Sequence, residues 1–142
     1  MYTCLEDSLK NRIAKDLALE YLAEYEEPLR LSPDMLEAIL KTINFFRNVC
    51  AHEERLYNFR LQKPAKVGGL AKALGFDSSH LEQGNVFSAV AFLKLVLPKD
   101  DFISLKSQLE NLFKQYEECF TSVSFQTIKQ NMGFSDIWLS IL

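Results

Sequence analysis

The spacing of apolar residues most constrains this fold, because it follows the period of an α-helix along nearly the whole chain. Between residues 4 and 25, apolar side chains recur in steps of three and four, which places them on one stripe of a helix. The stripe comprises Leu5, Leu9, Ile13, Leu17, Tyr21, Leu22 and Tyr25. The five glycines and four prolines fall mainly where such helices would end. The pattern predicts an all-α protein.

A second helix should begin at Ser32-Pro33-Asp34, which supplies an N-cap, a proline for the first turn and an acidic residue. Its core-facing stripe comprises Met35, Leu36, Ile39, Leu40, Ile43, Phe46, Val49 and Cys50. This stripe is complete without the polar residues nearby. We therefore expect a neighbouring side of the same helix to be free to line a surface or a cleft. That side carries Arg47, Asn48, Ala51, His52 and Arg55.

The rest of the chain predicts further helices within one domain spanning residues 1–142. A short helix at 70–74 should end at Gly75, and a longer one at 86–97 should turn Val86, Val90, Leu93 and Leu97 inward. The next helix, capped by acids at 100–101, should reach about residue 120. Two short pieces at 125–142 should hinge at Gly133, with Ile137, Trp138 and Ile141 clamping the end of the bundle.

Composition argues against several classes of protein. No apolar run approaches the roughly 20 residues of a membrane span, and the first residues lack the pattern of a secretory signal. Three widely spaced cysteines predict buried, reduced thiols in the cytoplasm, with Cys50 on the buried side of its helix. The two histidines provide no zinc cluster, and His80 lies in a turn-like stretch, where we expect an exposed bystander. We expect no metal and no cofactor.

The charge is unevenly distributed. The chain carries −3 overall, but residues 41–72 hold seven cations and two anions, a net +5. This concentration is either a solvated helix face or a basic patch that steers a phosphate ligand.

Arg47 and His52, with four residues between them, lie inside this basic segment. An imidazole can move a proton near neutral pH, and a guanidinium can grip a phosphate with two parallel hydrogen bonds. Together they suffice for RNA cleavage without a metal. Taken singly, His52 fits a surface or capping role, and Arg47 fits an ion pair with Glu54.

The run from Arg47 to Asn58 reads Arg-Asn-x-Cys-Ala-His-x-x-Arg-Leu-Tyr-Asn, and Met-Gly-Phe-x-x-x-Trp occurs at 132–138. Both resemble the signature of the Abi-like (abortive infection) proteins, a branch of the HEPN superfamily. The resemblance implies a HEPN-like bundle of four to five main helices plus short C-terminal helices. It also implies a metal-independent endoribonuclease of phage-defence or toxin type.

In such enzymes two domains pair so that Arg and His from each converge, and the 2′-hydroxyl of RNA attacks the phosphate. The implied partners are RNA, a second copy of the chain, and an antitoxin or regulator. The resemblance makes Arg47 and His52 the catalytic residues. Four others support them: Asn48 to orient His52 or bond the backbone, Arg55 to contact phosphate or pair with Glu54, and Tyr57 and Asn58 to pack and cap the helix end.

The chain departs from the family in two ways. Members often have a second His directly after the first, where Glu53 stands here. Members are also commonly longer, so we expect a short variant or the C-terminal part of a longer ancestor. The acidic overall charge and the missing His favour an alternative: a non-catalytic HEPN-type module that binds RNA or a protein partner.

Overall fold

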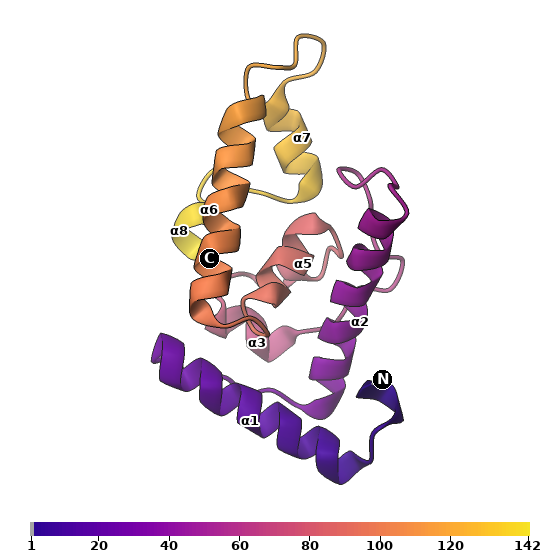
Figure 1. Cartoon of the computed structure of the whole chain (residues 1–142), viewed down its shortest axis with the longest axis vertical. Helices are drawn as coiled ribbons and strands as arrows, with labels where there is room; N and C mark the ends of the chain where they lie inside the picture. Colours follow the sequence, from indigo (N-terminus) through magenta and orange to yellow (C-terminus); the bar gives the residue numbers. More distant parts are fainter. Residues whose placement is uncertain (1) are drawn as a thin grey trace.

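The chain folds into helices in the computed structural model, which describes residues 2–142, with Lys72 and Ala73 described by their backbone alone. A short 3-10 helix, η1, precedes eight α-helices, and the described residues contain no strand (Figure 1). Their bounds are η1 (Tyr2–Cys4), α1 (Asp7–Tyr25), α2 (Pro33–Ala51), α3 (Gly68–Ala73), α4 (Ser78–Leu81), α5 (Val86–Leu93), α6 (Lys99–Tyr116), α7 (Phe125–Met132) and α8 (Trp138–Ile141). The predicted all-α class is confirmed.

Helix α5 lies in the middle of the molecule, between α2 and α6, while α1 crosses one end (Figure 1). Every residue from Phe87 to Phe92 is buried, because other elements cover this helix from several sides. The predicted inward face was therefore wrong in part: Val86, Leu93 and Leu97 are only half-buried. The helix also ends at Leu93, earlier than predicted.

Helix α2 begins as predicted, with the Ser32 hydroxyl accepting a hydrogen bond from the Met35 amide at 3.2 Å. Helix α1 buries less of its stripe than predicted, since only Ala14 and Tyr21 are buried in it. Leu9 and Leu22 are exposed. The reason is the placement of α1 across the end of the bundle, where only part of its stripe can meet other helices (Figure 1).

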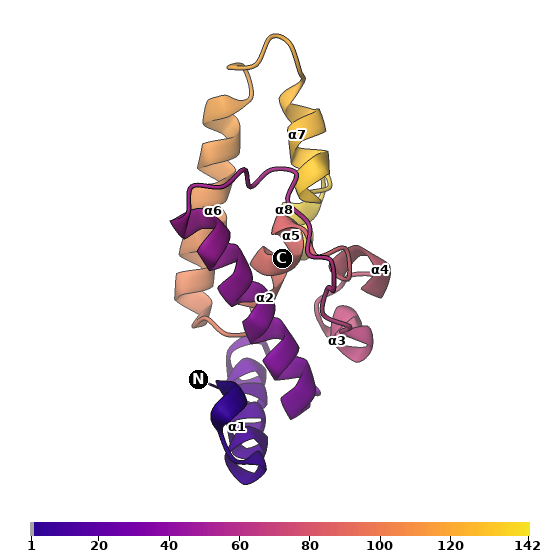
Figure 2. The ribbon, with the colours of Figure 1, turned by 90° about the vertical axis from the view of Figure 1, so that its right-hand side faces the viewer.

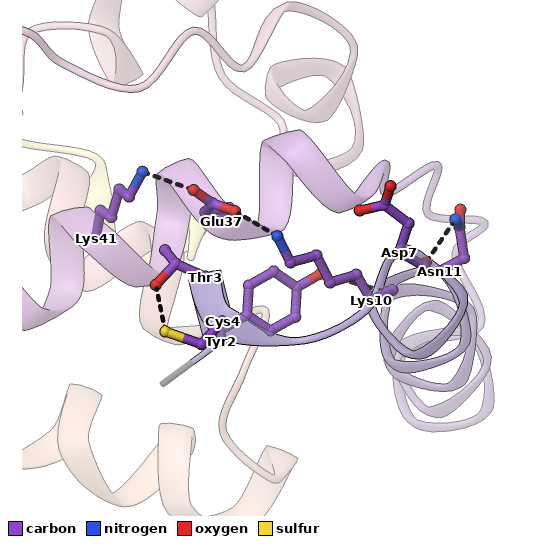
Figure 3. A network of polar contacts seen from close by, with 8 residues as sticks. All are labelled: Tyr2, Thr3, Cys4, Asp7, Lys10, Asn11, Glu37 and Lys41. Carbon is purple, nitrogen blue, oxygen red and sulfur yellow. Dashed lines mark hydrogen bonds and ion pairs between the residues drawn. The ribbon is translucent and has the colours of Figure 1, made fainter.

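A polar network joins the N-terminal segment to α1 and α2 (Figure 3). Glu37 accepts hydrogen bonds from Lys41 at 2.6 Å and from Lys10 at 3.3 Å, and these bonds lower the pKa of its carboxyl group. The Tyr2 hydroxyl donates to the Lys10 carbonyl at 3.2 Å. The Lys10–Glu37 pair links α1 to α2, although an ion pair at the surface adds little stability.

Aromatic rings form the core where α5, α6 and the C-terminal helices meet. The ring of Phe134 makes edge-to-face contacts with Phe87, Phe113 and Trp138, with centroids 5.4, 5.0 and 5.0 Å away. Trp138 is buried as predicted, whereas Ile137 is 62% exposed and does not clamp the bundle. Helix α6 ends at Tyr116, short of the predicted residue 120.

His80 is half-buried and packs against this core, so it is not a solvent-exposed bystander. It lies in α4, which was not predicted, and its Nε2 is hydrogen-bonded to the Gly133 carbonyl at 2.9 Å. Its ring also packs edge-on against Phe87 at 4.9 Å. The prediction of a bystander was wrong, because His80 links α4 to the turn after α7.

None of the helices in the described part of the chain combines the length and the apolar character that crossing a bilayer demands.

Candidate functional site

The C-terminal end of α2 carries the predicted site, and it is shaped by a left-handed turn at Glu53, whose φ is 53°. The Glu53 amide donates to the Cys50 carbonyl at 3.2 Å, and the Glu54 amide donates to the Val49 carbonyl at 3.1 Å. These two bonds form a Schellman motif, which ends the helix at Ala51.

Ending α2 at Ala51 corrects two predictions. Arg55 is not part of the helix, since it follows the turn at Glu53. Tyr57 and Asn58 lie six and seven residues beyond the last helical residue, so they do not cap it. All three side chains are exposed.

Arg47 and His52 are both exposed. Five positions along a helix correspond to a rotation of about 140° between two side chains, so these two diverge rather than converge. The Arg47 guanidinium donates to the Asn48 side-chain oxygen at 3.1 Å. The Asn48 side chain thus contacts Arg47, while its backbone carbonyl accepts from the His52 amide at 3.0 Å.

Neither arginine of this region is neutralised by a neighbour. Among the described residues, the ion pairs include neither Arg47 nor Arg55, so the predicted alternatives with Glu54 are not formed. An exposed cation without a carboxylate partner is available to an anionic ligand.

The cysteines correct another prediction, since Cys4, Cys50 and Cys119 are all exposed rather than buried. Cys50 lies one residue before the end of α2, where no further turn of helix covers it. Within residues 2–142, no group of three His, Cys, Asp or Glu side chains is arranged to hold a metal ion.

A groove of about 820 Å³ lies beside the predicted site, and sequence reasoning did not locate it. One side is α2, and the other is the irregular segment 59–66, which runs back towards α3 (Figure 2). We call it the basic groove, and its lining residues are Ala38, Lys41, Thr42, Phe45, Phe59, Arg60, Leu61, Gln62, Lys63, Pro64, Ala65 and Lys66.

The basic groove accounts for four of the seven cations in the positive segment, and none of its lining residues is acidic. The uneven charge was the available signal, but it could not show which cations meet. The side chain of Lys72, another of the seven cations, lies outside the described residues.

Comparison with known proteins bears on the first part of the chain. Residues 1–58 match the family model described as Abi-like protein. This stretch contains α1, α2 and the whole run from Arg47 to Asn58. The chain matches none of the curated proteins and none of the solved structures with which it was compared. Over residues 1–58, the chain is therefore similar to the Abi-like proteins.

Proposed function

We propose that this protein is a metal-independent endoribonuclease of the HEPN type that acts in abortive infection. The observation that carries the proposal is the exposure of Arg47 and His52 within the segment that matches the Abi-like family. Neither side chain is used by the core, and Arg47 has no carboxylate partner among the described residues. Both are therefore available to a phosphate.

The reaction uses the nucleophile that RNA itself carries. A His52 imidazole takes the proton of the 2′-hydroxyl, the 2′-oxygen forms a bond to phosphorus, and the bond from phosphorus to the 5′-oxygen breaks. A second imidazole returns a proton to the 5′-oxygen, which leaves a 2′,3′-cyclic phosphate and a 5′-hydroxyl. One positioned proton-transfer group contributes roughly 10²–10⁴-fold. Arg47 stabilises the added negative charge on the phosphate.

The proposed site is composite, with Arg47 and His52 from each of two chains. The rotation of about 140° between the two side chains on one helix supports this arrangement, because a single chain would not aim both at one phosphate. Pairing two copies supplies two imidazoles, one as base and one as acid.

A second candidate is a non-catalytic module that binds RNA or a protein. It is favoured by the net charge of −3 and by Glu53 at the position of the second family histidine. A carboxylate there repels phosphate instead of assisting its reaction.

The test is cleavage of single-stranded RNA in EDTA by the parent and by the Arg47→Ala and His52→Ala variants. Each substitution should lower the rate by roughly 10²–10⁴-fold, and products should end in 2′,3′-cyclic phosphate. Arg30→Ala, an exposed arginine between α1 and α2, is the matched control and should cleave like the parent.

A parent that cleaves no RNA, or cleavage that survives both substitutions, rejects the nuclease. Loss of cleavage in EDTA rejects metal independence. A strictly monomeric protein in sedimentation, still fully active, rejects the composite site.

A further inference from the structure

We propose that the basic groove binds the RNA as a single strand, with one base stacked on Phe45 and the backbone held by Lys63 and Lys66. This inference rests on the proposed function, since it names the surface that holds the substrate of that site. At about 820 Å³, the groove lies in the range of roughly 300–1,000 Å³ typical of pockets for drug-sized ligands.

The charge of the groove fits a phosphate backbone. Lys63 and Lys66 are exposed, and neither is in an ion pair within the described residues. Lys41 lines the same groove but forms an ion pair with Glu37 at 2.6 Å, which reduces the positive charge that Lys41 offers to a phosphate. In a chain of net charge −3, two unpaired lysines in one groove attract a polyanion to that place.

Phe45 provides a flat apolar surface beside these lysines. Its side chain is 48% exposed, although it lies on α2 next to the buried Phe46. The ring stacks on Phe59 at 5.5 Å, and Phe59 packs edge-on against Phe46 at 5.6 Å. Phe59 thus packs against the Phe45 ring, while about half of the Phe45 side chain stays exposed to solvent. Cations beside an exposed aromatic ring are how proteins bind unpaired bases.

Arg60 has a different role, although it also lines the groove. Its guanidinium donates to the Asn131 carbonyl at 3.3 Å and to the Gln83 side chain at 3.4 Å. The Leu61 amide donates to the Gly84 carbonyl at 2.9 Å. These bonds fix segment 59–66 in place, so Arg60 positions the wall of the groove.

The α2 face that lines the groove is the one on which helical spacing places the proposed catalytic histidine. Phe45 and His52 are seven residues apart, which on a helix means nearly the same side and about 10 Å along the axis. His52 follows the last helical residue directly and stays close to helical geometry, with φ −96° and ψ 10°. A strand stacked on Phe45 would therefore extend along α2 to His52.

The experiment measures binding without cleavage, by fluorescence anisotropy of a short 2′-O-methyl oligoribonucleotide, which lacks the nucleophile. Lys63→Glu/Lys66→Glu should weaken binding at least tenfold at low salt and should flatten its salt dependence. The control, Lys15→Glu/Arg30→Glu, makes the same change of charge at exposed positions outside the groove and should weaken binding far less.

The aromatic platform is tested by Phe45→Leu, which keeps an apolar side chain, and by Phe45→Trp, which keeps a ring. We expect Phe45→Leu to weaken binding roughly fivefold or more and Phe45→Trp to bind like the parent. A duplex of the same sequence should bind more weakly, since its bases are already stacked within the helix.

The groove assignment is overturned if the groove pair and the control pair weaken binding equally, or if Phe45→Leu binds like the parent. RNA that is cleaved normally by the groove variants also overturns it, while leaving the nuclease intact. Groove-dependent binding by a parent that never cleaves unmodified RNA instead supports the groove and rejects the nuclease.

Discussion

Helices α2 and α7 end in the same backbone turn but in opposite surroundings. Each ends in a Schellman motif with a left-handed residue, Glu53 at φ 53° and Gly133 at φ 93°. After α7, the Gly133 amide donates to Gln130 at 2.9 Å, and the Phe134 amide donates to Lys129 at 3.0 Å. The residue after the turn is exposed at α2, but at α7 it is Phe134, in the centre of the aromatic core.

The comparison shows that the same turn can place the next residue in the core or at the surface, depending on the elements that lie beside it. At Gly133 an added Cβ would overlap the side-chain amide of Asn85, which is fully buried and caps α5 through the Ser88 amide at 3.0 Å. At the end of α2, Glu53 is exposed and can carry a side chain. The glycine therefore serves stability, whereas the end of α2 is free to carry function.

The largest expected effect comes from filling the space at Gly133. Gly133→Ala combines the cost of a left-handed non-glycine residue with overlap at Asn85, roughly 2–5 kcal/mol in total. The free energy of unfolding in urea should fall by this amount. Gly69→Ala, where nothing lies within 4 Å of an added Cβ, is the control and should not destabilise the protein, since alanine is favoured over glycine within a helix such as α3. Equal stability of the two variants would show that the C-terminal turn is not held by packing.

The reverse change at the other turn should stabilise the protein. Glu53→Gly relieves a non-glycine residue in left-handed geometry and is expected to add about 1 kcal/mol to the free energy of unfolding. The urea midpoint of Glu53→Gly, compared with that of Glu53→Ala, measures this gain, because alanine removes the carboxylate and keeps the strain. If both variants gain the same stability, the charge of Glu53, and not its left-handed backbone, is what destabilises this turn in the parent.

The smallest effects on stability are expected at the candidate catalytic residues. Arg47→Ala and His52→Ala remove exposed side chains and should change the free energy of unfolding by no more than about 0.5 kcal/mol. Thermal unfolding followed by circular dichroism checks this. A clear loss of stability in either variant would mean that the end of α2 has a structural role, as α7 does.

Much of the fold could be predicted from local sequence. The Ser32-Pro33 start of α2, the stop at Gly133 and the burial of Trp138 depend on caps, backbone preferences and apolar spacing, all of which a short stretch of sequence displays. The end of α2 could not be predicted in this way, because Glu53 takes a conformation that its residue type does not favour. That error carried Arg55 into the predicted helix, whereas Cys50 lies in α2 as predicted but is exposed.

Contacts between distant parts of the chain account for the other differences. The neighbours of His80 in sequence predict an exposed turn, whereas its hydrogen-bond partner, Gly133, lies 53 residues away. The residues of the candidate site were identified from a motif, but the basic groove was not. The two walls of the basic groove come from different stretches of sequence, α2 and segment 59–66. The groove forms only because segment 59–66 folds back beside α2.

Segment 59–66 has neither helix nor strand, yet hydrogen bonds near each of its ends hold it in place. The Leu61 amide is bonded to the Gly84 carbonyl at 2.9 Å, and just past the segment the Val67 amide is bonded to a Glu82 carboxylate oxygen at 2.9 Å. An irregular segment fixed in this way loses little conformational entropy when a ligand settles against it. Its bonded amides should also exchange with solvent more slowly than the absence of secondary structure suggests.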